Sequence, residues 1–114
     1  MAKKRKTPEA EVLKAISEYL FAMMRVGKGV WWRVNNGGVY DPTKKVFRKP
    51  AGKLNYAGIS DIMGVYNGKF YAIEVKAGKN KATSEQEAFG QMVESQDGVF
   101  ILAYSVDDLL EIFT

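Results

Sequence analysis

Two strand-like runs separated by Asn67-Gly68 constrain the fold of this chain more than any other feature. Residues 60–66 and 69–76 are rich in β-branched, aromatic and other apolar residues. Asn-Gly between two such runs is the strongest short-range signal for a β-hairpin, because a two-residue type I′ turn needs positive φ at both central positions. With these two residues as the loop, the register of the hairpin follows by counting outwards from the turn.

That register places two carboxylates opposite each other. Counting outwards pairs Ile62 with Ile73 and Asp61 with Glu74, and the β-carbons of opposed residues are about 5 Å apart. Like charges in this arrangement destabilise an ordinary sheet, so a compensating group is expected, and a divalent cation with oxygen ligands suits the position. Lys76 lies two residues beyond Glu74 and therefore on the same face of its strand.

Asp, Glu and Lys on one face are the residue types that metal-assisted phosphodiester hydrolysis needs. The carboxylates hold an ion that polarises the phosphoryl oxygen and acidifies water, while the lysine orients that water and offsets developing charge. The alternative is an exposed strand end, where Lys76 forms a surface salt bridge with Glu74 or Asp61 that is nearly neutral in energy. The opposed carboxylates favour the first interpretation.

The distribution of charge along the chain indicates a polyanionic partner. Residues 1–58 contain 13 Lys and Arg against 4 Asp and Glu, whereas residues 59–114 contain 4 against 9. A basic half of this kind is typical of a nucleic-acid-binding surface, although a basic pI can also serve solubility alone. Histidine and cysteine are both absent, which excludes Ser-His-Asp and Cys-His catalysis and zinc sites built on imidazole or thiolate.

The remaining patterns predict a single α/β domain, since 114 residues with 46% hydrophobic content suffice for one core. No apolar run reaches the roughly 20 residues that span a bilayer, and the N-terminus lacks the pattern of a signal peptide, so we expect a soluble, intracellular protein without membrane contact.

The expected elements follow from the apolar periodicity and the turn residues. The first half is expected to form a helix from Pro8 to the glycines at 27 and 29, a strand at 30–34, and an irregular basic stretch at 39–56 with a short ribbon at Val46-Phe47. After the hairpin we expect a helix after Thr83 carrying Phe89, Met92 and Val93, a strand at 99–104, and a terminal helix holding Leu109, Leu110, Ile112 and Phe113.

Three segments resemble the motifs of the VRR-NUC nucleases, a family of the PD-(D/E)XK superfamily. They are residues 58–62 (Gly-Ile-Ser-Asp-Ile), 71–78 (Tyr-Ala-Ile-Glu-Val-Lys-Ala-Gly) and 83–86 (Thr-Ser-Glu-Gln). The resemblance runs from about residue 8 to residue 110. It implies a restriction-endonuclease-like αβββαβ core with a small mixed sheet flanked by helices, divided into a basic arm at residues 1–7 and a nuclease domain at residues 8–114.

The resemblance also implies how the central residues act. Asp61 and Glu74 are then ligands of Mg²⁺ or Mn²⁺, the Val75 carbonyl is a further ligand, and Lys76 is the catalytic lysine. Ser60 stands where the superfamily has proline. The departure is minor, because proline at that point shapes the entry into the strand and supplies no ligand.

Two further residues come from helices. The family has an acidic residue on its first helix, and Glu9 fits that metal position by spacing and face, with Glu11 as the alternative. Gln86 matches the family's helix glutamine near the active site and is grouped with the catalytic residues, and it fits equally well as a capping-box partner of Thr83.

Stand-alone members of this size resemble virus and mobile-element proteins that act on branched DNA, often as homodimers. We therefore expect a homodimeric, Mg²⁺-dependent endonuclease in the cytoplasm of a bacterium or a virus-infected cell. Its substrate would be structured DNA such as a Holliday junction, for which two sites on a twofold dimer suit paired cuts. The residues expected to contact DNA phosphates are Lys3, Lys4, Arg5, Lys6, Arg33, Asn36, Lys44, Lys45, Arg48, Lys49 and Lys53.

Other interpretations remain open at this point. The chain could be a non-catalytic nucleic-acid-binding module with a vestigial nuclease site, or a structural interaction protein, for which the opposed Asp61 and Glu74 have no explanation. Trp31 and Trp32 face opposite sides of their strand, so one of them could contact DNA or a second copy, but burial in the core is the expectation for both.

Overall fold

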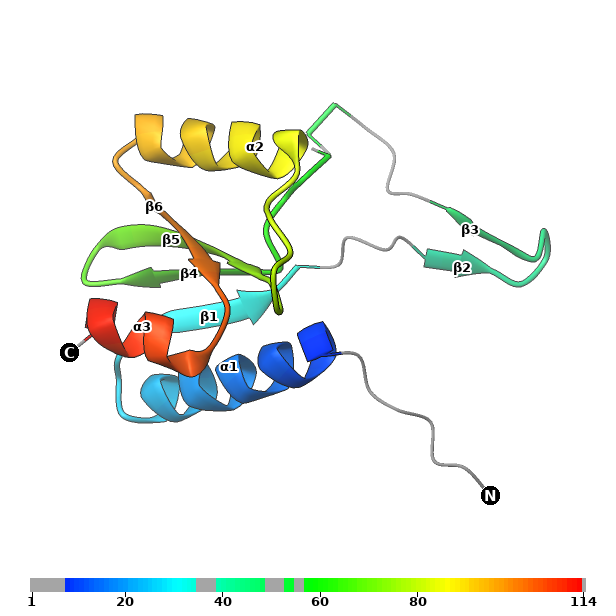
Figure 1. The fold of residues 1–114 in the computed structure, drawn as a ribbon. Coiled ribbons are helices and arrows are strands. Elements are labelled where there is room, and N and C mark those ends of the chain that lie inside the picture. Colours follow the sequence, from blue (N-terminus) through cyan, green and yellow to red (C-terminus); the bar gives the residue numbers. More distant parts are fainter. Residues whose placement is uncertain (1–7, 35–38, 49–52, 55–56, 114) are drawn as a thin grey trace, which may run out of the picture.

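A mixed β-sheet lies between two layers of helices in the part of the chain that the structure describes (Figure 1). The computed structural model describes residues 8–34, 39–48, 53–54 and 57–113. The predicted basic arm at residues 1–7 therefore lies outside the described residues. No helix in the described ranges is long and apolar enough to cross a lipid bilayer.

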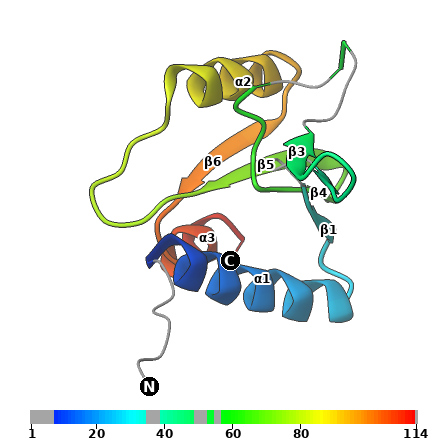
Figure 2. The same ribbon diagram turned by 90° about the vertical axis from the view of Figure 1, so that its right-hand side faces the viewer.

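The sheet has the strand order β1-β4-β5-β6 and is antiparallel except for the parallel pair β5 and β6. A separate antiparallel ribbon of β2 and β3 projects to one side (Figures 1 and 2). Apart from this ribbon and α3, the elements follow one another as α, β, β, β, α, β. Their bounds are α1 (Pro8–Arg25), β1 (Val30–Arg33), β2 (Val39–Asp41), β3 (Val46–Arg48), β4 (Ile62–Tyr66), β5 (Lys69–Val75), α2 (Ser84–Ser95), β6 (Val99–Ala103) and α3 (Val106–Phe113).

The predicted hairpin register is confirmed. Asn67 and Gly68 have φ values of 53° and 76°, as a type I′ turn requires. Tyr66 lies opposite Lys69, and Ile62 lies opposite Ile73. The strand β4 begins at Ile62 and not at residue 60, so the ladder stops one residue before the predicted pair of carboxylates.

The alternation of side chains along β5 divides the core between the two faces of the sheet. Tyr71, Ile73 and Val75 pack on the face covered by α1 and α3, together with Ile16 and Leu20 of α1. Ala72 points to the other face, where it packs with Phe89 and Val93 of α2. Glu74 follows Ala72 by two residues and shares its face, so the site carboxylate lies on the α2 side of the sheet.

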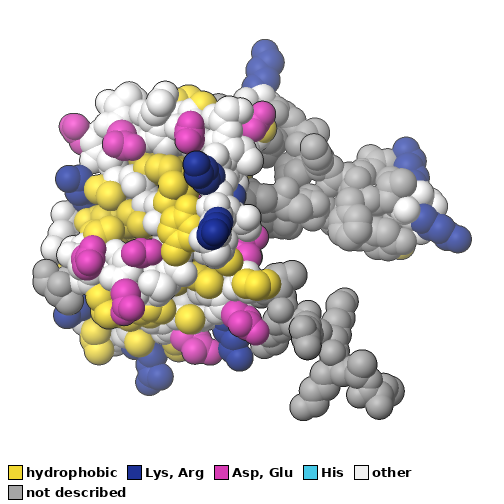
Figure 3. All heavy atoms as spheres, viewed as in Figure 1, with side chains coloured by type: hydrophobic (Ala, Val, Ile, Leu, Met, Phe, Trp, Pro, Cys, Tyr) yellow, Lys and Arg dark blue, Asp and Glu magenta, His cyan; other side chains and the backbone are white. Residues whose placement is uncertain are grey.

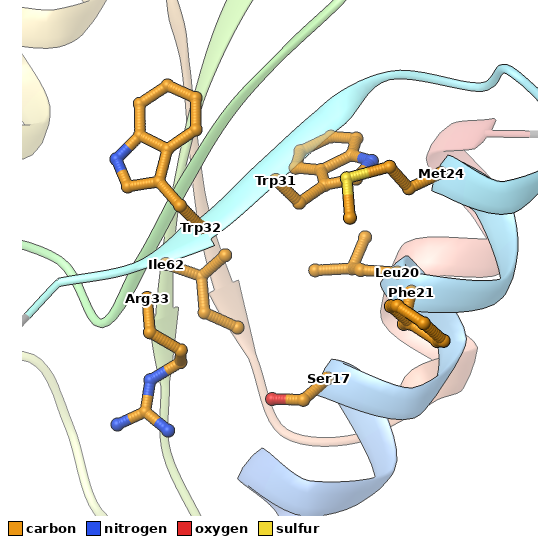
Figure 4. A pocket seen from close by; sticks show the side chains of 8 residues that line it. All are labelled: Ser17, Leu20, Phe21, Met24, Trp31, Trp32, Arg33 and Ile62. Atoms are coloured by element: carbon orange, nitrogen blue, oxygen red, sulfur yellow. The ribbon is translucent and has the colours of Figure 1, made fainter.

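The two tryptophans of β1 face opposite sides, as predicted, but their expected common burial is wrong. Trp31 is buried on the α1 side, where Gly64 lies opposite and leaves room for the indole. Trp32 points away from α1 and is 44% exposed (Figure 4). It is exposed because α2 covers β5 and β6 and leaves the β1 edge open.

Three apolar residues assigned to helix faces are also exposed, namely Met92 of α2 and Leu110 and Ile112 of α3. Each helix packs through a narrower stripe than its composition indicated. The stripe of α2 consists of Phe89, Gly90 and Val93, and α3 buries Leu109 while Phe113 is partly buried.

Candidate active site

Asp61 lies at the entry to β4 and connects three strands. Its backbone carbonyl accepts the N–H of Val34 at 2.9 Å, which extends the pairing with β1. Its side-chain Oδ2 accepts the N–H of Val75 at 2.8 Å. The carboxylate oxygen thus takes the place of the backbone carbonyl that would accept the Val75 N–H if β4 began earlier in the chain. This is the physical reason why the ladder ends at Ile62 while Asp61 still reaches the end of β5.

Glu74 is the most buried acidic residue of the site, with 4% of its surface exposed. Its Oε1 accepts a hydrogen bond from Gln86 Nε2 at 2.7 Å and lies 3.8 Å from the ammonium nitrogen of Lys76. Its Oε2 is buried and has no hydrogen-bond partner among the described residues. A buried carboxylate oxygen without a partner is costly, so this atom is the first place to look for a ligand.

The pKa of Glu74 is raised from 4.5 to about 8, mainly by burial and next by the neighbouring charge of Asp61. The charge of Glu9 also raises this pKa, whereas the charge of Lys76 lowers it. Asp61 and Glu74 are therefore close enough for the charge of one to act on the other, although they are not a ladder pair.

Gln86 completes the predicted capping box and also contacts Glu74. Its Oε1 accepts the backbone N–H of Thr83 at 2.9 Å, and the Thr83 hydroxyl accepts the backbone N–H of Gln86 at 3.2 Å, which completes a capping box. The Nε2 end of the same amide donates to Glu74. The cap turns the amide nitrogen towards the carboxylate, so helix capping and site geometry are one arrangement. Local sequence spacing predicts the cap but does not show that the same amide reaches Glu74.

The first turn of α2 also supports the segment that leads to Asp61. Gly58 has φ +79°, and a methyl group on it would come within 2.6 Å of the backbone nitrogen of Gln86. Two residues later Ser60 is fully buried, and its hydroxyl has no partner in the described part of the chain. Only glycine fits both the conformation and the close approach to α2, which ties the chain carrying Asp61 to the helix carrying Gln86.

The helix carboxylates are less closely involved. Glu9 is exposed, yet its charge acts on Glu74, and Glu11 exerts no such effect. Across the ranges that the structure describes, no three acidic side chains are grouped closely enough to hold a metal ion. The assignment of Glu9 as a ligand therefore stays a prediction, and the donors brought together are Asp61, Glu74 and the backbone of Val75.

The predicted DNA-contacting residues fall into two sets. Arg33, Lys44, Lys45 and Lys53 are exposed, with Lys44 and Lys45 in the connection between the two ribbon strands. Outside the described residues lie Lys3, Lys4, Arg5, Lys6, Asn36, Lys49 and the side chain of Arg48.

A small cavity of about 130 Å³ lies on the opposite side of the sheet, between α1 and β1 (Figure 4). Its lining is mostly apolar and includes Leu20, Met24 and Trp31, with Ser17 and Arg33 as polar members. It shares no residue with the carboxylate cluster, and it offers no acidic group.

Comparisons of the sequence with models of known protein families and with curated proteins find no match.

Proposed function

We propose that this protein is a metal-dependent endonuclease of the PD-(D/E)XK type, close to the VRR-NUC family, that hydrolyses phosphodiester bonds in structured or branched DNA. The single observation that carries the proposal is the Glu74 carboxylate, which is buried beside Asp61. Its Oε2 has no hydrogen-bond partner among the residues that the structure describes, and its Oε1 lies 3.8 Å from Lys76 Nζ. A buried Glu74 with a raised pKa beside a second carboxylate is unfavourable for folding, so function is the natural explanation. The element order α, β, β, β, α, β also supports the superfamily.

A divalent cation fits the donor set on chemical grounds. Asp61 and Glu74 supply two carboxylates, and a strand residue directs its N–H and C=O to the same neighbour, so the Val75 carbonyl points to the side on which its N–H meets Asp61. Hard oxygen donors of this kind select Mg²⁺ or Mn²⁺. When bound there, such an ion supplies Lewis-acid polarisation of the phosphoryl oxygen and acidifies water.

The protein side chains have separate tasks in this mechanism. Gln86 and the Val75 N–H hold the Glu74 and Asp61 carboxylates in fixed orientations before substrate arrives. Lys76, with 8% of its surface exposed, keeps its ammonium group beside Glu74 and is free to donate to a phosphate oxygen or to the attacking water. Donors fixed in advance lower the barrier because they need no reorganisation during the reaction.

Cleavage assays on labelled linear, flapped and four-way-junction DNA test the proposal, each with Mg²⁺, with Mn²⁺ and with EDTA. We expect cleavage only with metal, lost in Glu74→Gln, and stronger on branched substrates. Gln91→Glu changes an exposed residue of α2. It serves as a control variant that is purified and assayed in the same way and should cleave as the wild type does. DNA binding without cleavage under any of these conditions would favour a non-catalytic binding module. Sedimentation of the protein alone and with a junction tests the expected homodimer.

A further inference from the structure

The segment between β5 and α2, residues 76–83, carries positive charge where the rest of the second half is acidic. After residue 58 the chain has only four basic residues, Lys69, Lys76, Lys79 and Lys81. Two of these, Lys79 and Lys81, are exposed in this segment. Basic side chains stand on the surface between α2 and α3, two helices whose charged residues are all acidic (Figure 3). Neither lysine is among the predicted DNA contacts, because that prediction rests on the basic first half of the chain.

The segment is anchored by hydrogen bonds. It turns at Gly78, which has φ +60°, and the N–H of Asn80 donates to the Ala77 carbonyl at 3.2 Å. The hydroxyl of Tyr104, which follows β6, donates to the Asn80 carbonyl at 2.7 Å. Asn80 lies between the two lysines, so this bond holds the backbone from which both side chains project.

The two lysines are also close to the candidate active site along the chain. An extended chain advances at most about 3.6 Å per residue, so the Cα atoms of Lys79 and Lys81 lie within about 11 and 18 Å of that of Lys76. Neither lysine forms an ion pair with any residue in the described ranges. Figure 2 looks at the sheet from its right-hand side in Figure 1 and shows this segment projecting on one side and the β2–β3 ribbon on the other.

We propose that Lys79 and Lys81 bind the phosphodiester backbone of the nucleic acid within a few nucleotides of the bond that is cut. This inference rests on the proposed nuclease function and adds a contact surface to it. Ammonium groups on an anchored backbone contact phosphates and set the position of the strand without reading its sequence. The acidic surroundings on α2 and α3 would repel the strand elsewhere on that face, which confines its path to this segment.

Lys69 provides a matched control for the test. It is exposed and has the same charge, but it flanks the hairpin turn at the opposite end of β5. Lys69 and Lys76 are seven positions apart along an extended chain, which corresponds to about 24 Å between their Cα atoms. Lys69→Gln, Lys79→Gln and Lys81→Gln therefore change the net charge equally at different distances from the candidate active site.

The experiment measures binding of a short fluorescent DNA duplex and a four-way junction in EDTA, by anisotropy, over a series of salt concentrations. The slope of log K against log salt is negative, and each phosphate contact that is lost lowers its magnitude by about one. We expect Lys79→Gln and Lys81→Gln to lower this magnitude by about one each and the double variant by about two. Lys69→Gln should have the same slope as the wild type. Thermal melts check that all variants fold.

The outcomes separate this inference from the function on which it rests. If the wild type binds and cleaves DNA while the Lys79 and Lys81 variants keep its slope, the inference is wrong and the nuclease function stands. An equal loss in Lys69→Gln would mean that only net charge matters, which also overturns it. Binding with the expected slopes but no cleavage with any metal would support the contact surface and reject the nuclease. A wild type that binds no DNA rejects both.

Discussion

Gln86 donates a hydrogen bond of 2.7 Å to Glu74 Oε1 while the other end of its amide accepts the N–H of Thr83. The N-terminal turn of α2 therefore sets the orientation of a buried carboxylate on the neighbouring strand. The first prediction separates the two ends of this amide.

Gln86→Glu keeps an acceptor for the Thr83 N–H but replaces the donor to Glu74 with a third carboxylate. We expect the metal-free variant to lose about 1–3 kcal/mol of stability, because a buried acceptor loses its donor, and cleavage to fall by about two orders of magnitude. Urea unfolding and single-turnover rates measure both effects. Gln91→Glu makes the same charge change on the exposed side of α2 and should match the wild type. Full activity in Gln86→Glu would show that Gln86 is a capping residue alone.

The raised pKa of Glu74 predicts a pH-dependent stability of the metal-free protein. Glu74 keeps its proton in the folded state up to about pH 8, whereas its unfolded value is 4.5. The folded state thus binds more protons between these values, so stability from this group is fully present below pH 4.5 and is lost as pH rises to about 8, by up to about 1.4 kcal/mol per pH unit.

Melting temperatures in EDTA between pH 5 and pH 8 test this sign. The contribution of Glu74 to the stability of the wild type should fall as pH rises, and Glu74→Gln lacks this contribution. The melting temperature of the wild type should therefore fall relative to that of Glu74→Gln as pH rises. Because the ligand form of Glu74 is deprotonated, magnesium affinity should rise over the same interval. A pH-independent difference between the two proteins would contradict the raised pKa.

Asp61→Asn and Asp61→Ala separate the charge of Asp61 from its hydrogen bond. The asparagine oxygen can still accept the Val75 N–H, and the repulsion with Glu74 is removed, so we expect a higher melting temperature in EDTA than for the wild type. Alanine leaves the Val75 N–H without its partner, which costs about 1–3 kcal/mol, so this variant should be less stable than Asp61→Asn.

Magnesium should reverse the order of stability of the wild type and Asp61→Asn. A ligand that binds only the folded state stabilises it by mass action, so the wild type should gain stability with magnesium while Asp61→Asn gains little and does not cleave DNA. If the wild type gains nothing from magnesium or manganese, and Asp61→Asn is less stable in EDTA, then Asp61 is a structural residue.

Lys76→Met tests the catalytic lysine. Methionine fills most of the same buried space without the charge, and the ammonium group is not a cation ligand, so we expect cleavage to be lost while metal affinity is kept or slightly increased. Isothermal titration calorimetry with Mn²⁺ and a cleavage assay give the two readings. A large loss of metal affinity would remove this role from Lys76.

Gly58→Ala and Gly78→Ala test how strongly α2 supports the segment before Asp61. Both glycines have positive φ, at +79° and +60°, so both substitutions carry a backbone cost of about 1–2 kcal/mol. Only at Gly58 would the added methyl group meet the α2 backbone, since nothing lies within 4 Å of the position at Gly78. We expect Gly58→Ala to be further destabilised by about 1–3 kcal/mol and to cleave DNA more slowly. Equal free energies of unfolding in urea for Gly58→Ala and Gly78→Ala would show that α2 accommodates the added methyl group without loss of stability.

The sequence alone determined the features of this protein that depend on local chemistry. The Asn67-Gly68 turn dictates the hairpin register, because few residue pairs allow positive φ at both positions. The alternation of side chains then places Glu74 and Lys76 on one face. The Thr83 capping box and the start of α1 at Pro8 were likewise predicted, because helix ends are governed by nearby hydrogen bonds.

Only the tertiary structure decided how separate elements meet. The sequence could not show that Asp61 would reach the Val75 N–H with its side chain, that one amide would serve both Thr83 and Glu74, or that Trp32 would remain exposed. These relationships depend on which face of the sheet α2 covers and how far it extends over β1 and β4. That placement results from packing between residues far apart in the chain, which local sequence patterns do not encode.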